Sequence, residues 1–443
     1  MGGELAPGRR HDHGARHVDW LTARQEVLAL ARLVATESRR PALGDVVAAD
    51  IVAQRDVPPF AASAMDGFAV GGNPAHAGRF VVLSASGAGE QSGITLREGE
   101  AQRVMTGSVV PHGTWAVIPR ELASDGGSWV EVPASDRAGA FVRPAGSDVA
   151  RGATIARRGD VVTPALASVL GAQGLTTLPV FRRPRVGILS TGRELRRPGQ
   201  PTGDSGIYDG NGPALAALVE SLGAIAVDLG IADETQESVR DALVYGSRAC
   251  DVVLSTGGVS AGDTDVVQTV LLEMGDPAAI LRIGLKPAKP LAYGLVGAVP
   301  VLGLPGNPVS ALVSAWIFAV GLIDSCAGKT RVGPHVVWAQ AAAPFAGPRD
   351  GKVHLVRAHL SSTPSGLVVS DPTVNDSSRS LDLARANVVV VLTPGGGDVD
   401  PGAVVPAIAV EPGCWGVPFD QAAPFLGPVA PTSVGPTQVV GRW

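Results

Sequence analysis

Three turns between Asp251 and Ala311 carry the residue types that could do chemistry, and each follows a short β-branched run. They read STGGVSAGDTD (255–265), KPAKP (286–290) and LPGNPVSA (304–311). Alternation of buried strand, turn and helix is typical of a parallel α/β sheet, whose ligand crevice lies at the carboxyl ends of its strands. Glycines let backbone amides approach a ligand, and the helix N-terminus expected near Asp265 favours an anion. We therefore predict that the three turns share one site.

The lysines sharpen this prediction. The chain has 36 Lys and Arg residues, yet its only lysines are Lys286, Lys289, Lys329 and Lys352. The first two stand close together in the second turn. An ammonium group is a compact, strongly hydrated point charge, which suits the capture of a phosphate or another oxyanion. The pair therefore predicts an anionic small-molecule substrate.

Several carboxylates fall at or close to expected strand ends and turns, namely Asp148, Glu194, Asp209, Glu234 and Asp265. Carboxylates that converge on one crevice suit Mg²⁺, which prefers oxygen ligands and often bridges to phosphates. Any single acid is more often a solvated surface charge, and Asp265 could instead cap the helix that follows it. For Asp66, a turn-forming role beside Gly67 and a role in the site are equally good interpretations.

Composition favours a globular protein of several domains. The chain has 443 residues, of which 45% are hydrophobic and 17% charged. Its net charge of −5 argues against a nucleic-acid partner. No stretch approaches the roughly 18–20 apolar residues of a membrane span, and the longest candidate, Val309 to Ile323, is expected to be a core helix. Three widely separated cysteines, Cys250, Cys326 and Cys414, fit neither disulfides nor a structural zinc site and indicate a reducing, cytoplasmic location.

Hydrophobic periodicity predicts where the elements lie. One amphipathic helix is expected from Val18 to Ser38 and another from Pro164 to Gly174, with a small β-rich domain between them. Short β-branched runs from Val332 to about Val410 predict a small β-barrel. Between these parts we expect strands near 185–190, 225–229, 251–255, 291–295 and 299–302, and helices near 212–222, 235–245 and 265–274.

Motifs along nearly the whole chain, from about Trp20 to about Glu411, resemble one family. Besides GGVS, KPAKP and LPGNPVS, they include SAMDGFAV (63–70), RVMTG (103–107), STG (190–192) followed by Glu194, and IYD (207–209) with Asn211. Any one motif is weak, because Gly-Gly and Pro-Gly turns are common, but seven in order are specific. Together they are similar to the molybdopterin molybdenumtransferases, the family of MoeA and the gephyrin E-domain.

The resemblance implies an enzyme of molybdenum cofactor biosynthesis. Its reaction would be the Mg²⁺-dependent insertion of molybdate into adenylated molybdopterin, with release of AMP. Catalytic roles are implied for Glu194, Asp209, Asp265 and Asp148, and the first three of these would hold Mg²⁺. Substrate-binding roles are implied for the residues that match the family's motifs: Gly257, Gly258, Ser260, Lys286, Lys289, Pro305, Pro308, Thr106, Ser108 and Asp66.

The resemblance also implies a multidomain α/β fold. It predicts a disordered tail (1–17), a helical linker domain (18–50 with 150–181), a small β-rich domain (51–149), a central parallel-sheet α/β domain of the MogA/MoaB type that binds molybdopterin (182–328), a C-terminal β-barrel (329–411) and a Pro/Gly-rich tail (412–443). In this family the first helical piece packs with residues near 150–180. A homodimer is expected, with Thr106 and Ser108 closing the crevice across its interface, and other proteins of cofactor synthesis are candidate partners.

The chain departs from the family pattern at positions that bear on turnover. Ala61 stands where relatives carry an active-site Asp, Arg193 replaces an Asp, and Gly210 and Gly212 replace a Thr and an Arg. Two alternatives therefore stay open. One is the related molybdopterin adenylyltransferase, which shares the α/β fold, although a stand-alone domain lacks the matches in residues 60–110. The other is a paralogue that binds pterin or partner proteins without turnover.

Overall fold

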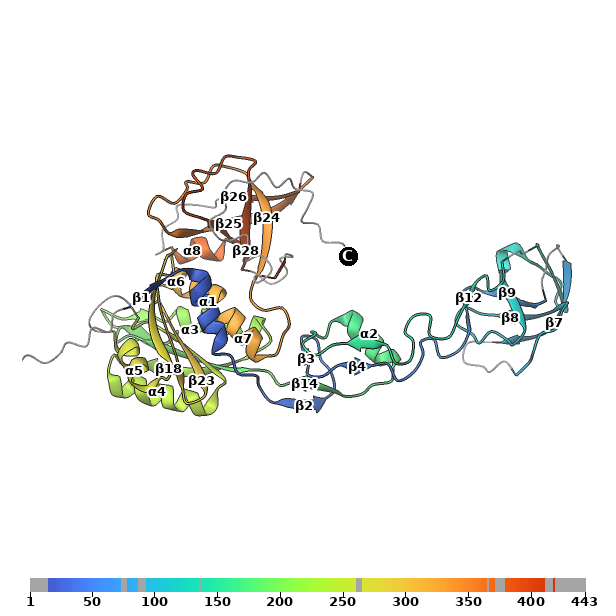
Figure 1. Cartoon of the computed structure of the whole chain (residues 1–443), viewed down its shortest axis with the longest axis horizontal. Helices are drawn as coiled ribbons and strands as arrows, with labels where there is room; N and C mark the ends of the chain where they lie inside the picture. The colour runs from blue at the N-terminus through green and yellow to red at the C-terminus, as the bar shows by residue number, and fades with distance from the viewer. Residues whose placement is uncertain are drawn as a thin grey trace, which may run out of the picture. The chain divides into compact units, whose positions relative to one another are not determined.

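The computed structural model describes residues 15–72, 78–86, 93–134, 137–259, 265–364, 366–370, 379–410 and 417–418. The chain forms two compact units, which are labelled by element in Figure 1. Unit 1 comprises Met1–Glu37 and Phe181–Trp443, and unit 2 comprises Ser38–Val180.

Unit 1 is built on a seven-stranded sheet in the order β1-β20-β22-β23-β19-β15-β18. Its strands are β1 (Arg16–Val18), β15 (Arg185–Thr191), β18 (Ile225–Ala232), β19 (Val252–Thr256), β20 (Ala278–Ile283), β22 (Pro290–Val296) and β23 (Val299–Leu304). The run β18-β15-β19-β23 is parallel, as predicted, but β22 is antiparallel to both of its neighbours. Only Gly297 and Ala298 join β22 to β23, and so short a connection can link only antiparallel strands. The sheet is therefore mixed rather than purely parallel.

Helices cover both faces of this sheet. Because successive side chains of a strand point to opposite faces, Val252 and Leu254 pack with α1 (Trp20–Ala29) and α3 (Asn211–Ser221), whereas Val253 packs with α4 (Gln236–Ala249) and α5 (Val266–Met274). Burial on both faces explains why the central strands are almost continuously hydrophobic. The helices predicted at 212–222, 235–245 and 265–274 are confirmed.

The longest apolar segment is a core helix, as predicted. It consists of α6 (Pro308–Ser314), a π-helical turn η2 (Ala315–Ala319) and α7 (Val320–Cys326). The helix Pro308–Cys326 is long and apolar enough to cross a membrane, but 83% of its most apolar window is buried inside the protein.

The N-terminal helix differs from the prediction in length and in packing. α1 starts after Asp19, whose carboxylate accepts the N–H groups of Leu21 and Thr22, and it ends at Ala29 rather than Ser38. Thr36–Arg39 instead form strand β2. The buried face of α1, with Trp20, Ala23 and Val27, belongs to the core cluster of the 308–326 helix in unit 1. The packing with residues near 150–180 that the resemblance implied is therefore wrong for α1, whose apolar stripe is covered within unit 1. Later residues of the same segment do pack there, because Val47 clusters with Ala156 and Val162.

The predicted C-terminal barrel is closed and five-stranded. Around the ring run β25 (Val353–Thr363), β26 (Gly366–Ser370), β24 (His335–Ala341), β28 (Val404–Ala409) and β27 (Val388–Leu392), which returns to β25. Val390 faces the barrel interior, whereas its neighbours Val389 and Val391 join the core shared with α6 and α7. This two-sided burial accounts for the unbroken β-branched run of β27.

Two short strands come from segments predicted as tails. β1 (Arg16–Val18) extends the main sheet beside β20, and β29 (Val417–Pro418) pairs with β24 of the barrel. β1 adds to the edge of the main sheet, where unpaired backbone groups accept another strand. β29 pairs with His335 and Val336 at the start of β24, whereas β26 pairs with the end of that strand. Two more elements lie next to the barrel, β21 (Leu285–Lys286), which pairs with β25, and α8 (Ser380–Ala384).

Unit 2 contains the predicted small β-rich domain and a linker region. The domain holds a six-stranded sheet in the order β10-β11-β7-β8-β6-β9 and the pair β12-β5; the linker holds the sheet β2-β14-β3, the pair β13-β4 and helix α2. Their bounds are β2 (Thr36–Arg39), β3 (Val46–Val47), β4 (Ile51–Val52), β5 (Ala62–Ser63), β6 (Gly67–Gly71), β7 (Gly78–Ser86), β8 (Glu100–Val104), β9 (Thr114–Pro119), a 3-10 turn η1 (Arg120–Leu122), β10 (Ser124–Asp125), β11 (Trp129–Val132), β12 (Val142–Arg143), β13 (Thr154–Ala156), α2 (Pro164–Ala172) and β14 (Leu178–Phe181). The Thr163 hydroxyl caps α2, which confirms the helix predicted there.

Candidate functional site

Two of the three predicted turns meet in one cavity of about 420 Å³ in unit 1. Its wall includes Gly257 and Gly258 after β19, Gly306 to Pro308 after β23, and Glu194 after β15. Parallel strands deliver their carboxyl ends to the same edge of a sheet, so turns that are distant in the sequence become neighbours. The prediction of a shared site is met for these two turns.

The glycine turn and the proline loop lie backbone against backbone. Gly257 has a φ of +89°, and a Cβ at this position would lie 2.4 Å from the Thr191 carbonyl oxygen, so only glycine fits. The Gly257 N–H donates to the Leu304 carbonyl at 3.2 Å. A Cβ on Gly306 would lie 3.3 Å from the Gly257 Cα. The cavity wall here is thus made of main chain, which can approach a ligand closely.

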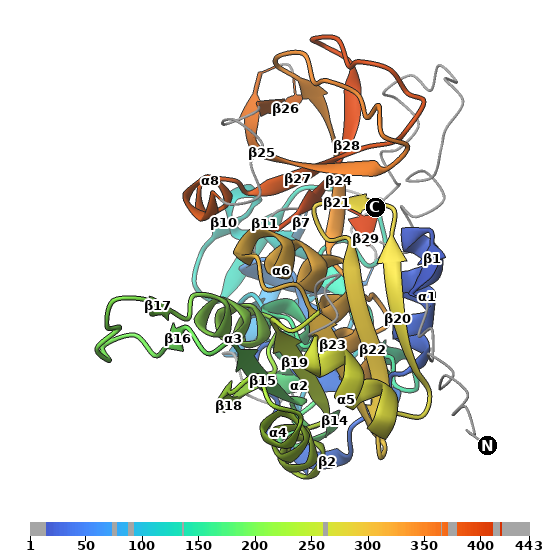
Figure 2. The ribbon, with the colours of Figure 1, turned by 90° about the vertical axis from the view of Figure 1, so that its left-hand side faces the viewer.

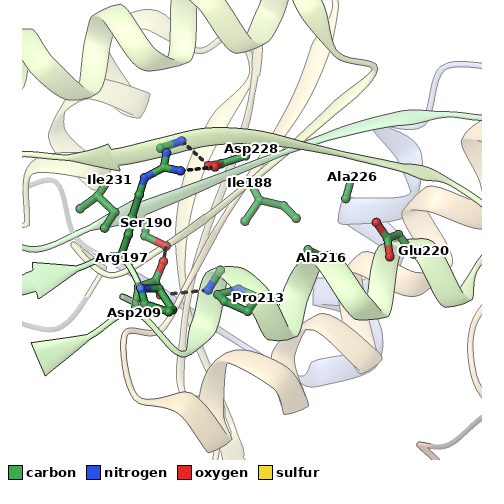
Figure 3. Close-up of a pocket in the computed structure, with 13 residues that line it drawn as sticks. Ile188, Ser190, Arg197, Asp209, Pro213, Ala216, Glu220, Ala226, Asp228 and Ile231 are labelled. Carbon is green, nitrogen blue, oxygen red and sulfur yellow. Dashed lines mark hydrogen bonds and ion pairs between the residues drawn. The ribbon is translucent and has the colours of Figure 1, made fainter. Parts of the chain in front are cut away.

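Asp209 is the carboxylate of this cavity that the protein itself holds most firmly. It is 8% exposed, and its Oδ1 accepts the N–H groups of Asn211 and Gly212, each at 3.0 Å. Its Oδ2 accepts the Ser190 hydroxyl at 2.6 Å, and Figure 3 shows these two side chains pointing toward one another. Asp209 therefore caps the N-terminus of α3 and ties it to β15.

The cap lies beside one position at which the chain departs from the family pattern. A Cβ at position 212 would lie 2.5 Å from Asp209 Oδ2, so no side chain fits there without a shift of the carboxylate. Gly212 therefore leaves room for the hydrogen bonds of Asp209 as they are arranged here.

Asn211 connects three segments that line the cavity. Its Nδ2 donates to the Thr256 hydroxyl and to the Gly306 carbonyl, both at 2.8 Å. Thr256 in turn donates to the Pro305 carbonyl at 3.0 Å. Pro305 is thus engaged through its main chain, and Pro308 lines the cavity directly.

Three further carboxylates line the cavity from three different segments, Glu194, Glu234 and Asp265. Asp265 precedes α5 but accepts no capping hydrogen bond through its side chain, which disfavours the alternative role of a helix cap. Arg193 Nε lies 3.9 Å from Glu234 Oε2, and both side chains are largely exposed. Such a pair contributes only about 0–1 kcal/mol to stability.

Among the described residues, no three His, Cys, Asp or Glu side chains converge closely enough to hold a metal ion. Magnesium, however, is commonly held by one or two carboxylates together with substrate phosphates and water. Glu194 and Asp265 fit such a partial site. Asp209, predicted as a third ligand, fits it less well because its oxygens already accept three hydrogen bonds.

The lysine turn is not among the described residues that line this cavity. Lys286 belongs to β21, which pairs with β25 of the barrel, and the Lys289 carbonyl accepts the Ile283 N–H at 2.8 Å. The turn nevertheless lies at the same edge of the sheet, because β22 begins at Pro290 and runs antiparallel to β23.

The two lysines of this turn differ from the other two. Lys329 pairs with Asp324 at 2.6 Å and Lys352 with Asp350 at 3.5 Å. Lys286 and Lys289 are exposed, and in the part of the chain that the structure describes no ion pair involves them. Their charges are available to an anion.

Four predicted site residues belong to unit 2. Thr106 donates to Asp66 Oδ1 through its N–H and its hydroxyl, both at 2.7 Å, and these bonds lower the pKa of Asp66. The buried Ser108 hydroxyl donates to the Met105 carbonyl at 2.7 Å, so its visible role is to hold a turn. Asp148 is exposed and donates its N–H to the Val57 carbonyl at 3.0 Å.

Two other positions complete the account of the predicted residues. Ala61, where relatives carry an acid, packs against an apolar cluster that includes Leu96 and Val104. Ser260 lies outside the described residues.

A second cavity, of about 470 Å³, was not foreseen from the sequence. It is lined by residues of β15, β18 and α3, and Asp209 lines both cavities. Figure 3 shows Arg197 and Asp228 pointing toward one another across it; Arg197 Nη1 lies 2.7 Å from Asp228 Oδ2. These residues carry no recognisable motif and come together only in the folded chain, so the sequence could not predict this cavity.

A mixed α/β sheet with a glycine-turn cavity, a closed barrel and a separate β-rich unit define a protein of the MoeA class. The family "MoeA N-terminal region (domain I and II)" matches residues 18–174, and "Probable molybdopterin binding domain" matches residues 187–324. The crystal structure of a molybdopterin biosynthesis MoeA protein from Pyrococcus horikosii aligns with 90% of this chain and 100% of its own, at a TM-score of 0.75 and 26% identity.

Curated relatives are closer in sequence. Molybdopterin molybdenumtransferase 2 of Mycobacterium tuberculosis is 36% identical over 301 residues, which cover 64% of this chain and 74% of the relative. Molybdopterin molybdenumtransferase of Haemophilus influenzae is 34% identical over 293 residues, covering 65% and 71%. The chain belongs to the molybdopterin molybdenumtransferase family.

Proposed function

We propose that this protein inserts molybdate into adenylated molybdopterin, with release of AMP, during molybdenum cofactor biosynthesis. The observation that carries the proposal is the cavity of unit 1, where a main-chain glycine turn, the N-terminus of α5 and the carboxylates Glu194, Glu234 and Asp265 meet. Membership of the family supports it independently.

Positively and negatively charged groups have different roles in this proposal. The glycine turn and the first turn of α5 favour a phosphate group, because N–H groups and the helix dipole both attract negative charge. Lys286 and Lys289, exposed at the same sheet edge, would neutralise phosphate charge that persists through the reaction. Glu194 and Asp265 would position the attacking oxygen near the phosphoanhydride that breaks.

Magnesium fits the same carboxylates. Glu194 and Asp265 would hold Mg²⁺, which would supply shielding of the phosphate charge and polarisation of the scissile phosphoanhydride bond.

The proposal includes a cytoplasmic homodimer. Cys250 and Cys326 are buried free thiols, and burial raises the pKa of both, to about 11 for Cys326. Such unreactive thiols are compatible with a reducing compartment. Sedimentation of the purified protein measures its oligomeric state, and a monomer at working concentration would remove the dimer from the proposal.

The decisive experiment combines purified protein, adenylated molybdopterin, Mg²⁺ and molybdate. We expect AMP release that requires Mg²⁺, together with a product that activates a molybdenum-dependent apoenzyme. Binding without AMP release would favour the non-catalytic paralogue, which Ala61 and Arg193 motivate. Formation of adenylated molybdopterin from molybdopterin and ATP would favour the adenylyltransferase.

A further inference from the structure

We infer that Asn211 is a positioning residue, whose side-chain amide sets the spacing of the two loops that wall the candidate site. This inference rests on the proposed function, because its effect is expressed in turnover. It gives a task to a cavity-lining residue for which no catalytic or binding role was predicted.

The amide makes two hydrogen bonds, one to each loop. Nδ2 carries two hydrogens, and both are used, toward the Thr256 hydroxyl beside the glycine turn and the Gly306 carbonyl in the proline loop, each at 2.8 Å. The Thr256 hydroxyl passes the connection on by donating to the Pro305 carbonyl at 3.0 Å. Asn211 is thus bonded directly to both loops, and the loops are bonded to each other.

Asn211 is itself fixed relative to the sheet. As the first residue of α3, it donates its main-chain N–H to Asp209 Oδ1, and Asp209 Oδ2 is bonded to Ser190 of β15. Figure 3 shows the Ser190–Asp209 part of this chain. The series Ser190–Asp209–Asn211 therefore transmits the position of a rigid central strand to the two loops.

On the side of the two loops that faces away from the candidate site, tight packing does not hold them in place. Asn211 and Pro308 also line a separate cavity of about 320 Å³, whose other residues include the apolar Leu312, Trp316 and Leu383. The start of α6 therefore has room to move if the amide bonds are lost. The Asn307 carbonyl accepts the Ala311 N–H at 2.8 Å, but its side chain caps that helix start with a long bond, which the Ser310 N–H donates at 3.4 Å.

The fold itself depends little on this amide. Helix α3 is anchored by the fully buried Leu215 and Val219, and Asn211 is only half-buried. A change of Asn211 should therefore shift the loops without unfolding the domain, which separates a positioning role from a structural one.

The test uses Asn211→Asp, which keeps the shape of the side chain but removes both donors. We expect kcat to fall on the order of a hundredfold, because small misplacements of a site can cost that much, with KM changed less than kcat and the melting temperature close to that of the wild type. As the pH falls toward about 4, near the ordinary pKa of an Asp side chain, the new carboxyl group gains a proton and one donor, so kcat relative to the wild type should rise. Ser221→Ala, at the other end of α3, is the control and should keep wild-type kcat.

Thr256 supplies a second pair of variants. Thr256→Val removes the hydroxyl and should resemble Asn211→Asp, whereas Thr256→Ser retains it and should keep wild-type kcat. The double variant combines Asn211→Asp with Thr256→Val. Its decrease in kcat, expressed as a free energy, should be much smaller than the sum of the two single decreases, because both changes break the same connection between the loops.

A readout that does not need turnover keeps the two proposals distinct. Hydrogen exchange of the Gly257 N–H, which is bonded to the Leu304 carbonyl at 3.2 Å, should be faster in Asn211→Asp and unchanged in Ser221→Ala. Unaltered exchange, or wild-type kcat in both Asn211→Asp and Thr256→Val, overturns the inference and leaves the proposed function standing. Faster exchange in a protein that never releases AMP overturns the proposed function instead.

Discussion

The polar side chains on the two sides of the main cavity differ in the hydrogen bonds that they make within the protein. On one side, Asp209 and Asn211 have their oxygens and hydrogens engaged by Ser190, Thr256 and main-chain groups. On the other side, Glu194 and Glu234 are exposed, and Asp265 leaves the start of α5 without a side-chain cap.

This contrast separates architecture from chemistry within one pocket. A carboxylate whose lone pairs already accept N–H and O–H groups stabilises the fold and would lose those bonds by taking a cation. An exposed carboxylate such as Glu194 can meet a ligand at a smaller cost. Substitutions on the bonded side should therefore change stability or positioning, and those on the open side should change turnover or binding.

The largest expected effect tests the open side. Asp265→Asn should abolish AMP release, since the amide cannot replace a carboxylate beside a cation or an attacking oxygen. The melting temperature should stay nearly unchanged, because the Asp265 side chain caps no helix N–H group. AMP release and calorimetry on the same sample measure both; a sharply lower melting temperature would show that the Asp265 carboxylate stabilises the fold.

The second-largest effect concerns Lys286 and Lys289, which lie at the same edge of the sheet as the cavity. Lys286→Ala or Lys289→Ala should weaken binding of adenylated molybdopterin by roughly 1.5–3 kcal/mol, typical of a hydrogen bond to a charged group. Lys352→Ala is the matched control, because that lysine already pairs with Asp350. Titration calorimetry decides: equal affinities in all three folded variants would withdraw the two lysines from the site.

A smaller effect tests the bonded side. Asp209→Ala leaves two N–H groups and the Ser190 hydroxyl without their acceptor, and should lower the free energy of unfolding by about 1–3 kcal/mol. Urea denaturation of the variant and the wild type measures the difference. If stability is unchanged but turnover disappears, Asp209 acts on the ligand and the contrast between the two sides fails.

The smallest effect concerns the exposed ion pair of Arg193 with Glu234. Arg193→Asp restores the acid of the family pattern and breaks a 3.9 Å pair between exposed side chains, so the free energy of unfolding should change by less than about 1 kcal/mol. The added negative charge near Glu234 should make turnover more dependent on salt and Mg²⁺. Identical salt and Mg²⁺ dependence in both proteins would show that the charge at position 193 does not affect turnover.

Local patterns predicted much of the fold. The helices and the five longer parallel or hairpin strands predicted between Arg185 and Leu304 were foreseen because β-branched runs and glycine turns are local signals. Strand β20 (Ala278–Ile283) and the short strands β16 (Leu195–Arg196), β17 (Ile207–Tyr208) and β21 were not. The end of α1 at Ala29 was missed because apolar residues continue at helical spacing to Val34, although the chain has already turned toward β2. The partner of α1 depended on which apolar face was free, a property of the folded unit.

The site was foreseen in its residues more than in their arrangement. The glycine turn, the proline loop and the acids stood out by type and spacing. The bonds of Asn211 reach Thr256 and Gly306, 45 and 95 residues away, and no local pattern encodes them. The pairing of β21 with β25, which draws the lysine turn toward the barrel, is equally non-local.

The sequence of the first turn of α3 has a consequence for how long the protein keeps its native chemistry. Asn-Gly is the dipeptide most prone to deamidation, because the glycine nitrogen can attack the asparagine side chain and form a succinimide. In the folded protein the Gly212 N–H is bonded to Asp209 and both amide hydrogens of Asn211 are engaged, which restrains that attack. The unfolded chain has no such protection. We expect protein that is refolded or stored warm to accumulate Asp or isoaspartate at position 211, and peptide mass mapping should show this chemical ageing advance in step with lost turnover.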